Sequence, residues 1–202
     1  MSTRIDKRFA ALMANGEKGF IAFITAGDPG LRETEDMVLR LGEAGVDIIE
    51  LGIPFSDPLA DGRVNQESAA RALESGTTVE GVFETVQRIR RQSDIPILCY
   101  TYMNPIHARG PEKVLKAAAQ AGVDGMLFLD LPVEESAPYV TWMRAHGLNN
   151  ITLVTPTTPA KRIARIVSRA SGFVYCVSRE GVTGTQKSLG TAALELVATT
   201  KE

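Results

Sequence analysis

The sequence predicts an α/β protein that folds as a (β/α) barrel of the TIM family, and three observations support this prediction. Short apolar segments alternate with helical patterns along the chain, which is typical of parallel strands joined by helical crossovers. The segments EAGVDIIELG (43–52) and QAGVDGMLFLD (120–130) repeat a helix end, a glycine, Val-Asp and a strand. Such repeated units favour a barrel over a doubly wound sheet, and no Gly-x-Gly-x-x-Gly motif follows the first expected strand.

Each expected strand is followed by a helix with recognisable end signals. The first of these helices closes at Gly45, because glycine commonly ends a helix in the left-handed conformation. In the next helix Thr77 and Glu80 have capping-box spacing, and apolar residues recur through 79–89 at about 3.6-residue intervals. The last expected helix spans 190–200. The six expected strands span 19–25, 46–52, 96–102, 125–130, 150–155 and 172–177.

The pattern contains six of the eight β/α units that a TIM (β/α)8 barrel has, and such barrels typically need about 250 residues. We therefore expect residues 1–202 to form a single barrel domain that is incomplete at its C-terminus. The strands at 19–25 and 172–177 would then be open edges, which favour association with other chains. We expect the chain by itself to be unstable, to oligomerise or to rearrange.

The composition excludes several classes of function. The 202 residues are 44% hydrophobic and 23% charged, with a net charge of -2, so the chain lacks the basic face that nucleic-acid binding needs. No apolar run reaches the roughly 18 residues of a membrane helix, and the charged N-terminal segment has no signal-peptide core. We expect a cytoplasmic protein that binds neither nucleic acid nor membrane.

Cysteine and histidine give no sign of a metal or cofactor. Cys99 and Cys176 lie in hydrophobic runs and are expected to be reduced, buried thiols. His107 and His146 are isolated from each other and from the cysteines, so no metal-ligand cluster is visible. The sequence therefore predicts no metal and no cofactor.

Glu50 is an acid inside an apolar strand, and its position suggests a catalytic role. Because strand side chains alternate between faces, Glu50 shares a face with Ile48, whereas Ile49 and Leu51 point to the other side. The apolar outer face of a barrel packs under helices, so we expect Glu50 to face the interior. It lies near the carboxyl end of the strand, where barrel enzymes carry their active sites.

A second acid, Asp61, follows at the end of the loop IPFSDPLADG (53–62). Burial should raise the pKa of Glu50, so that it can give and take protons near neutral pH, whereas Asp61 should be better solvated and ionised. Two acids in different environments suit two different roles. Alternatively, Glu50 could pair with a basic residue and Asp61 could cap the turn before the next helix.

Five segments of the chain resemble one family. ELGIPFSDPLADG (50–62) closely resembles the signature of the tryptophan synthase alpha subunits, and its length makes the match specific. The segments FITAGDPG (23–30), YTYMNPI (100–106), LDLPVEES (129–136) and SREGVTGT (178–185) are similar to family segments and follow in family order. The resemblance covers essentially the whole chain.

The resemblance implies a lyase that cleaves indole-3-glycerol phosphate to indole and glyceraldehyde 3-phosphate in tryptophan biosynthesis. In this chain Glu50 matches the family's general acid and base, which protonates the indole ring at C3 and assists proton transfer from the glycerol hydroxyl. Asp61 matches the carboxylate that hydrogen-bonds the indole N–H and stabilises the positive charge that develops there. Tyr175 matches a third catalytic position, with its hydroxyl at the rim near Glu50.

The resemblance also implies four substrate-binding residues. Phe23 would form an aromatic wall for indole, and Tyr100 would line the same site. Thr183 would contact the Asp61 region from a mobile lid over 179–185, and Gly184 would donate its backbone N–H to the substrate phosphate. In the family most phosphate donors follow the sixth unit, so Gly184 is the one such donor that this sequence includes.

The expected partner is the beta subunit of tryptophan synthase in an α2β2 heterotetramer. The loop 54–60, with an apolar tip, and the Asn104-Pro105 turn resemble the surface that meets this subunit. An alternative function is a truncated, non-catalytic module that binds or activates a beta-type partner. A different phosphate-binding barrel enzyme is a further alternative, against which the 50–62 segment argues.

Overall fold

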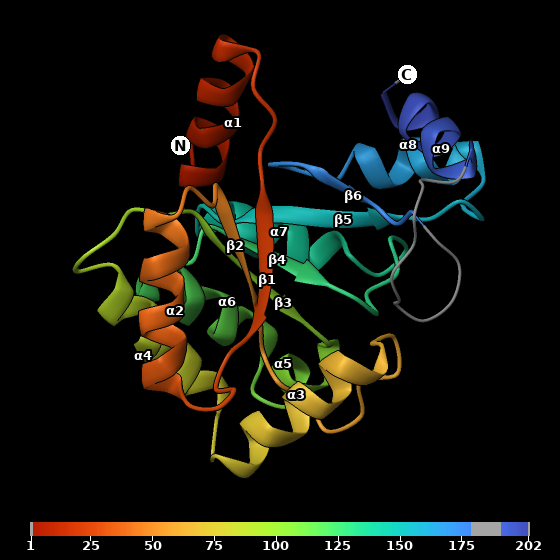
Figure 1. Ribbon diagram of the computed structural model, residues 1–202. Coiled ribbons are helices and arrows are strands. Elements are labelled where there is room, and N and C mark those ends of the chain that lie inside the picture. The colour runs from red at the N-terminus through yellow and green to blue at the C-terminus, as the bar shows by residue number, and fades with distance from the viewer. Residues whose placement is uncertain (1, 179–190, 202) are drawn as a thin grey trace.

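The computed structural model describes residues 2–178 and 191–201, which form six strands and nine helices, with one or two helices between successive strands (Figure 1). The strands are β1 (Ile21–Thr25), β2 (Ile48–Gly52), β3 (Ile97–Thr101), β4 (Gly125–Phe128), β5 (Asn149–Val154) and β6 (Val174–Cys176). The helices are α1 (Arg4–Asn15), α2 (Leu31–Glu43), α3 (Arg63–Glu74), α4 (Val79–Ile89), α5 (Met103–His107), α6 (Pro111–Ala121), α7 (Ala137–Ala145), α8 (Ala160–Val167) and α9 (Thr191–Lys201). None of the helices in these residues is long and apolar enough to cross a membrane.

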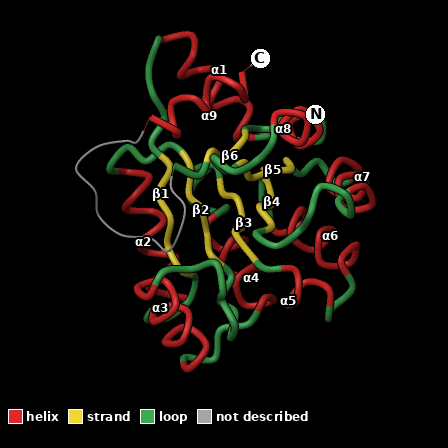
Figure 2. Tube along the Cα trace, turned by 90° about the vertical axis from the view of Figure 1, so that its right-hand side faces the viewer, coloured by secondary structure: helices red, strands yellow, loops and turns green. Residues whose placement is uncertain are grey.

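The six strands are parallel and pair in chain order from β1 to β6, which confirms the α/β fold class. In Figure 2 they lie side by side at the centre of the molecule, as a curled half-barrel with helices around it. The register places Phe23 beside Glu50, and Glu50 beside Leu98 on β3. One strand further along, Tyr100 lies beside Leu127.

The two faces of the sheet carry separate cores, as the alternation of side chains predicts. The outer core packs β2 residues such as Ile49 and Leu51 under helices α2, α4 and α6. The inner core contains one buried apolar residue from each of four neighbouring strands. These residues are Ile48, Leu98, Leu127 and Ile151. Glu50 is two residues from Ile48 and therefore faces the barrel interior, as expected.

Helix α1 was not expected from the sequence, and it closes the amino end of the barrel. Ile5 is fully buried in the inner core, and Phe9 packs against the same cluster. Thr3 and Asp6 form a capping box that starts the helix. In Figure 1, α1 and α3 lie at opposite ends of the strands. Helix α1 covers the amino end, and α3 lies at the carboxyl end, just after Asp61.

Three equivalent positions bind α1 at the amino ends of the strands. They are Asp47, Asp124 and Asn149, and each comes two residues after a helix-ending glycine with positive φ. Two of them also cap a neighbouring strand segment: Asp47 accepts a hydrogen bond from the Phe20 N–H (2.6 Å), and Asp124 accepts one from the Ile97 N–H (2.9 Å). The sequence repeat thus has a structural role at the amino end of the barrel.

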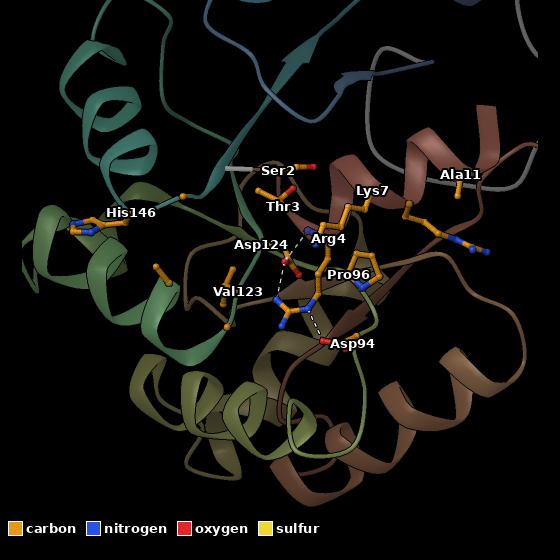
Figure 3. A pocket seen from close by; sticks show the side chains of 14 residues that line it. Ser2, Thr3, Arg4, Lys7, Ala11, Asp94, Pro96, Val123, Asp124 and His146 are labelled. Atoms are coloured by element: carbon orange, nitrogen blue, oxygen red, sulfur yellow. Dashed lines mark hydrogen bonds and ion pairs between the residues drawn. The ribbon is translucent and has the colours of Figure 1, made fainter. Parts of the chain in front are cut away.

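Each of these positions has its own partner on or next to α1. Arg8 donates to Asp47 at 2.6 Å, and Arg4 pairs with Asp124 at 3.2 Å. Asn149 donates to Asp6 at 3.2 Å and accepts a hydrogen bond from Thr3. Figure 3 shows Arg4 between Asp124 and Asp94 in the cleft beside α1.

Two expectations about helices need correction. Helix α4 begins one residue later than the Thr77–Glu80 capping box predicts, because Thr78 is the N-cap and accepts the Gly81 N–H at 3.1 Å. Thr77 is buried, and its hydroxyl lies 3.2 Å from that of Ser75. Helices α3 and α5 were also not expected, so Asn104-Pro105 lies within a short helix instead of a turn.

Candidate active site

Glu50 is the buried acid of the carboxyl end. Its side chain lies on the inner face of β2 and is 5% exposed. Its Oε1 atom has no hydrogen-bond partner, and Glu50 forms no ion pair, among the residues that the structure describes. Burial in this apolar interior raises its pKa to about 7. The alternative of an acid paired with a basic residue is therefore not what the structure shows, and a carboxyl with this pKa can act as acid or base near neutral pH.

Asp61 is held by two tyrosine hydroxyls. Tyr100 donates to Oδ1 at 3.2 Å, and Tyr102 donates to Oδ2 at 2.8 Å. The side chain is 7% exposed, so the expectation of a well solvated carboxylate is wrong. It also does not cap a helix, because Gly62 is the N-cap of α3 and receives no side-chain cap bond. Asp61 is thus a buried, hydrogen-bonded acceptor, in contrast to Glu50.

The loop that carries Asp61 is fixed at both of its sides. The Asp61 N–H donates to the carbonyl of Pro58 at 3.0 Å, which closes a tight turn. The side chain of Gln66 on α3 donates to the Asp61 carbonyl at 2.8 Å, and the Ala60 N–H donates to the Tyr102 hydroxyl at 3.0 Å. These bonds direct the Asp61 carboxylate toward the carboxyl ends of β2 and β3.

Phe23 and Tyr100 form an aromatic wall next to the two acids. Their rings meet edge to face, with centroids 5.2 Å apart. Gly52 leaves the space for this wall, because a Cβ at that position would lie 2.8 Å from Cζ of Phe23. The pKa of Tyr100 is raised, first by burial and then by the negative charge of Asp61, with a smaller effect from Glu50. Tyr100 therefore experiences the charge of both carboxylates.

Tyr175 lies on β6 and is 38% exposed. Its pKa is raised by burial and by the charge of Glu50, so its hydroxyl lies close enough to that acid to be affected by its charge. No hydrogen bond joins the two side chains in the described part of the chain. Thr183 and Gly184 lie outside the described residues, as does the expected lid at 179–185.

Tyr102 is the site residue that sequence reasoning missed. It is 6% exposed, bonds Asp61 and the loop, and stacks at a tilt on Phe55 with ring centroids 5.4 Å apart. A signal was available, because Tyr102 lies two residues after Tyr100 and so shares its strand phase.

The cavities of the molecule lie at both ends of the barrel. A small cavity beside Asp61 is lined by Phe23, Gly52, Tyr100 and Tyr102, among others. A larger cleft lies at the amino end beside α1 (Figure 3), where Arg4 pairs with both Asp124 and Asp94. Within the described residues no group of three or more histidine, cysteine or acidic side chains is arranged to hold a metal ion.

The amino-acid sequence matches one family over most of its length. The model of the tryptophan synthase alpha chain family matches residues 9–202. Similar proteins include the tryptophan synthase alpha chain of Opitutus terrae, 48% identical over 97% of this chain and 74% of its own length. The alpha chain of Citrifermentans bemidjiense is 49% identical over 93% of this chain and 70% of its own length.

Solved structures support the same assignment. The tryptophan synthase alpha chain of Legionella pneumophila superposes with a TM-score of 0.91 at 35% identity, and the match covers 100% of this chain and 75% of that one. A structure of the tryptophan synthase α2β2 complex of Pyrococcus furiosus gives a TM-score of 0.84 at 38% identity, over 91% and 73% of the two chains. The chain therefore belongs to the tryptophan synthase alpha chain family, a family of lyases in tryptophan biosynthesis.

Proposed function

We propose that this protein cleaves indole-3-glycerol phosphate to indole and glyceraldehyde 3-phosphate, with Glu50 as the acid and base and Asp61 as the fixed anion. The observation that carries the proposal is the state of Glu50, a buried carboxyl at the carboxyl end of a barrel strand. Its pKa of about 7 and its unpartnered Oε1 suit a group that must both give and take a proton.

The reaction adds a proton to a carbon atom of the substrate and removes a proton from an oxygen atom of the substrate. Protonated Glu50 delivers its proton to C3 of the indole ring, which places a positive charge on the ring nitrogen. The glycerol hydroxyl next to the ring then loses its proton to the Glu50 carboxylate. The bond between C3 and the glycerol carbon breaks, its electrons return to the ring, and the carbon becomes the aldehyde of glyceraldehyde 3-phosphate. Glu50 ends in the protonation state in which it began.

Asp61 stabilises the intermediate by accepting a hydrogen bond from the indole N–H. A preoriented anion in a buried site interacts more strongly with the developing charge than a solvated one does. Phe23 and Tyr100 provide an aromatic surface beside it, with centroids 5.2 Å apart, that suits a planar indole ring. Tyr175 near Glu50 is proposed as the third catalytic residue. The roles of Thr183 and Gly184 in binding substrate stay predictions.

The proposed partner is a tryptophan synthase beta subunit that docks on loop 54–60 and on Asn104-Pro105. Leu59 at the tip of this loop is 81% exposed, which favours a docking surface. The tip is smaller than expected from the sequence, because Pro54 is buried and Phe55 packs on Tyr102. Co-elution with a beta subunit in size-exclusion chromatography tests this part of the proposal.

Indole release from indole-3-glycerol phosphate tests the catalytic proposal. Removing a general acid costs on the order of 10²- to 10⁴-fold, so Glu50→Gln should lower kcat/KM by at least about hundredfold, and Asp61→Asn should also reduce it strongly. Glu43→Gln is the matched control, because Glu43 is exposed at the end of α2. The proposal fails if the Glu50→Gln protein retains the activity of the Glu43→Gln protein.

A further inference from the structure

Tyr100 has a hydroxyl with a single partner in the described residues, and that partner is Asp61. The residue lies on the inner face of β3, where its Cα pairs with Gly52 on one side and Leu127 on the other. Its ring is fixed edge-on against Phe23, and its hydroxyl donates to Oδ1 of Asp61 at 3.2 Å. The strand and the aromatic contact therefore determine where the hydroxyl lies.

Tyr102 approaches the same carboxylate from the end of the strand. Its hydroxyl donates to Oδ2 at 2.8 Å and also accepts the Ala60 N–H at 3.0 Å, so Tyr102 holds both the carboxylate and its loop. Each oxygen of Asp61 thus has one tyrosine donor. A carboxylate held at one oxygen can still rotate about its side-chain bonds, whereas donors at both oxygens fix its plane.

We propose that Tyr100 is a positioning residue, which acts on the reaction through Asp61 by fixing the orientation in which the carboxylate meets the indole N–H. The proposal rests on the proposed function of Asp61. Burial and the charges of Asp61 and Glu50 raise the pKa of Tyr100, so its hydroxyl stays a hydrogen-bond donor throughout the working pH range. Unlike the Tyr102 hydroxyl, which accepts the Ala60 N–H, the Tyr100 hydroxyl makes no bond to the backbone of the loop in the described residues.

The Tyr100→Phe variant keeps the ring that packs on Phe23 and removes only the hydroxyl. Loss of a hydrogen bond to a charged group should lower kcat for indole release by about tenfold or more. KM should stay within about threefold, because the ring still packs on Phe23 and the bonds that Tyr102 makes to the loop are retained. Tyr139→Phe is the matched control, since Tyr139 packs among rings in the outer layer, against Phe128 and Trp142. A fall in kcat equal to that of the control overturns the proposal.

A double-mutant cycle decides whether Tyr100 acts through Asp61. If it does, Tyr100→Phe should cause no further fall in kcat when Asp61 is already Asn. An equal fall in both backgrounds would mean that Tyr100 acts independently of Asp61, and would overturn the proposal. A rise in KM comparable to the fall in kcat would indicate that Tyr100 acts as a wall for the substrate, and would also overturn the proposal.

A binding measurement separates this proposal from the proposed catalytic function. Indole and 1-methylindole differ at the ring nitrogen, and only indole can donate to Asp61. The parent protein should prefer indole, and Tyr100→Phe should reduce the preference by about tenfold, as read from fluorescence titration of each ligand. This readout needs no turnover. An unchanged preference in Tyr100→Phe overturns the role of Tyr100 even if cleavage is observed, and a reduced preference supports it even if cleavage is absent.

Discussion

At the residue scale, Glu50 makes stability depend on pH in an unusual direction for a carboxylic acid. Its pKa is about 7 in the folded protein and 4.5 as the ordinary value, because burial disfavours the ionised form. The folded state therefore holds the proton more tightly than the unfolded state does. The contribution of this group to stability is complete below about pH 4.5, falls as the pH rises to about 7, and is level above that value.

This linkage predicts a difference between the parent protein and Glu50→Gln. The free energy of unfolding of the parent, relative to that of the variant, should fall by roughly 3 kcal/mol between about pH 4.5 and pH 7. Urea denaturation of both proteins at several pH values measures it. Parallel pH dependences for the two proteins would show that Glu50 ionises freely in the folded state.

The sequence predicts Glu50 better than it predicts the surroundings of Asp61. Alternation of side chains in one strand is enough to place Glu50 inside the barrel. Asp61 depends on contacts between the loop and β3, because its two donors, Tyr100 and Tyr102, are 39 and 41 residues away along the chain. No local pattern reports such contacts, and for this reason the burial of Asp61 was not expected.

At the element scale, α1 covers the amino end of the barrel and buries Ile5 in the inner core. Its sequence contains many charges, and the sequence alone gave no reason to place it against a core. Three of those charged side chains, Arg8, Arg4 and Asp6, contact Asp47, Asp124 and Asn149 respectively, which are equivalent positions of the repeated unit. The helix has local signals, the Thr3–Asp6 capping box and the helical spacing of Ile5 and Leu12, but its packing against the barrel depends on strand-end residues far away in the sequence.

Ile5 is the apolar contact through which α1 should stabilise the barrel. It is fully buried with Ile48 and Leu98, so Ile5→Ala should lower the free energy of unfolding by about 2–5 kcal/mol. Met13→Ala is the control on the same helix, because Met13 is 80% exposed. Similar losses in chemical denaturation of the two variants would mean that α1 contributes through its helical structure alone, without closing the core.

At the scale of the whole molecule, the two ends of the barrel have different tasks. The amino end holds charge pairs with α1, and the carboxyl end holds an unpaired acid and a tyrosine-bonded acid. The sequence predicts only the carboxyl-end part of this division, because six strands alternate with helices and the acid lies at a strand's carboxyl end. In the described residues β1 and β6 each pair on one side, and the expectation of an unstable or oligomeric chain stays a prediction.

The most direct test is the pH profile of kcat/KM for indole release, because this ratio reports the ionisation of groups in the free enzyme. If protonated Glu50 starts the reaction, kcat/KM should fall about tenfold per pH unit above about pH 7, and Glu50→Gln should lack the activity that produces this limb. A profile that stays flat from about pH 6 to pH 9, or an active Glu50→Gln protein with the same limb, would contradict the assignment of Glu50 as the proton donor.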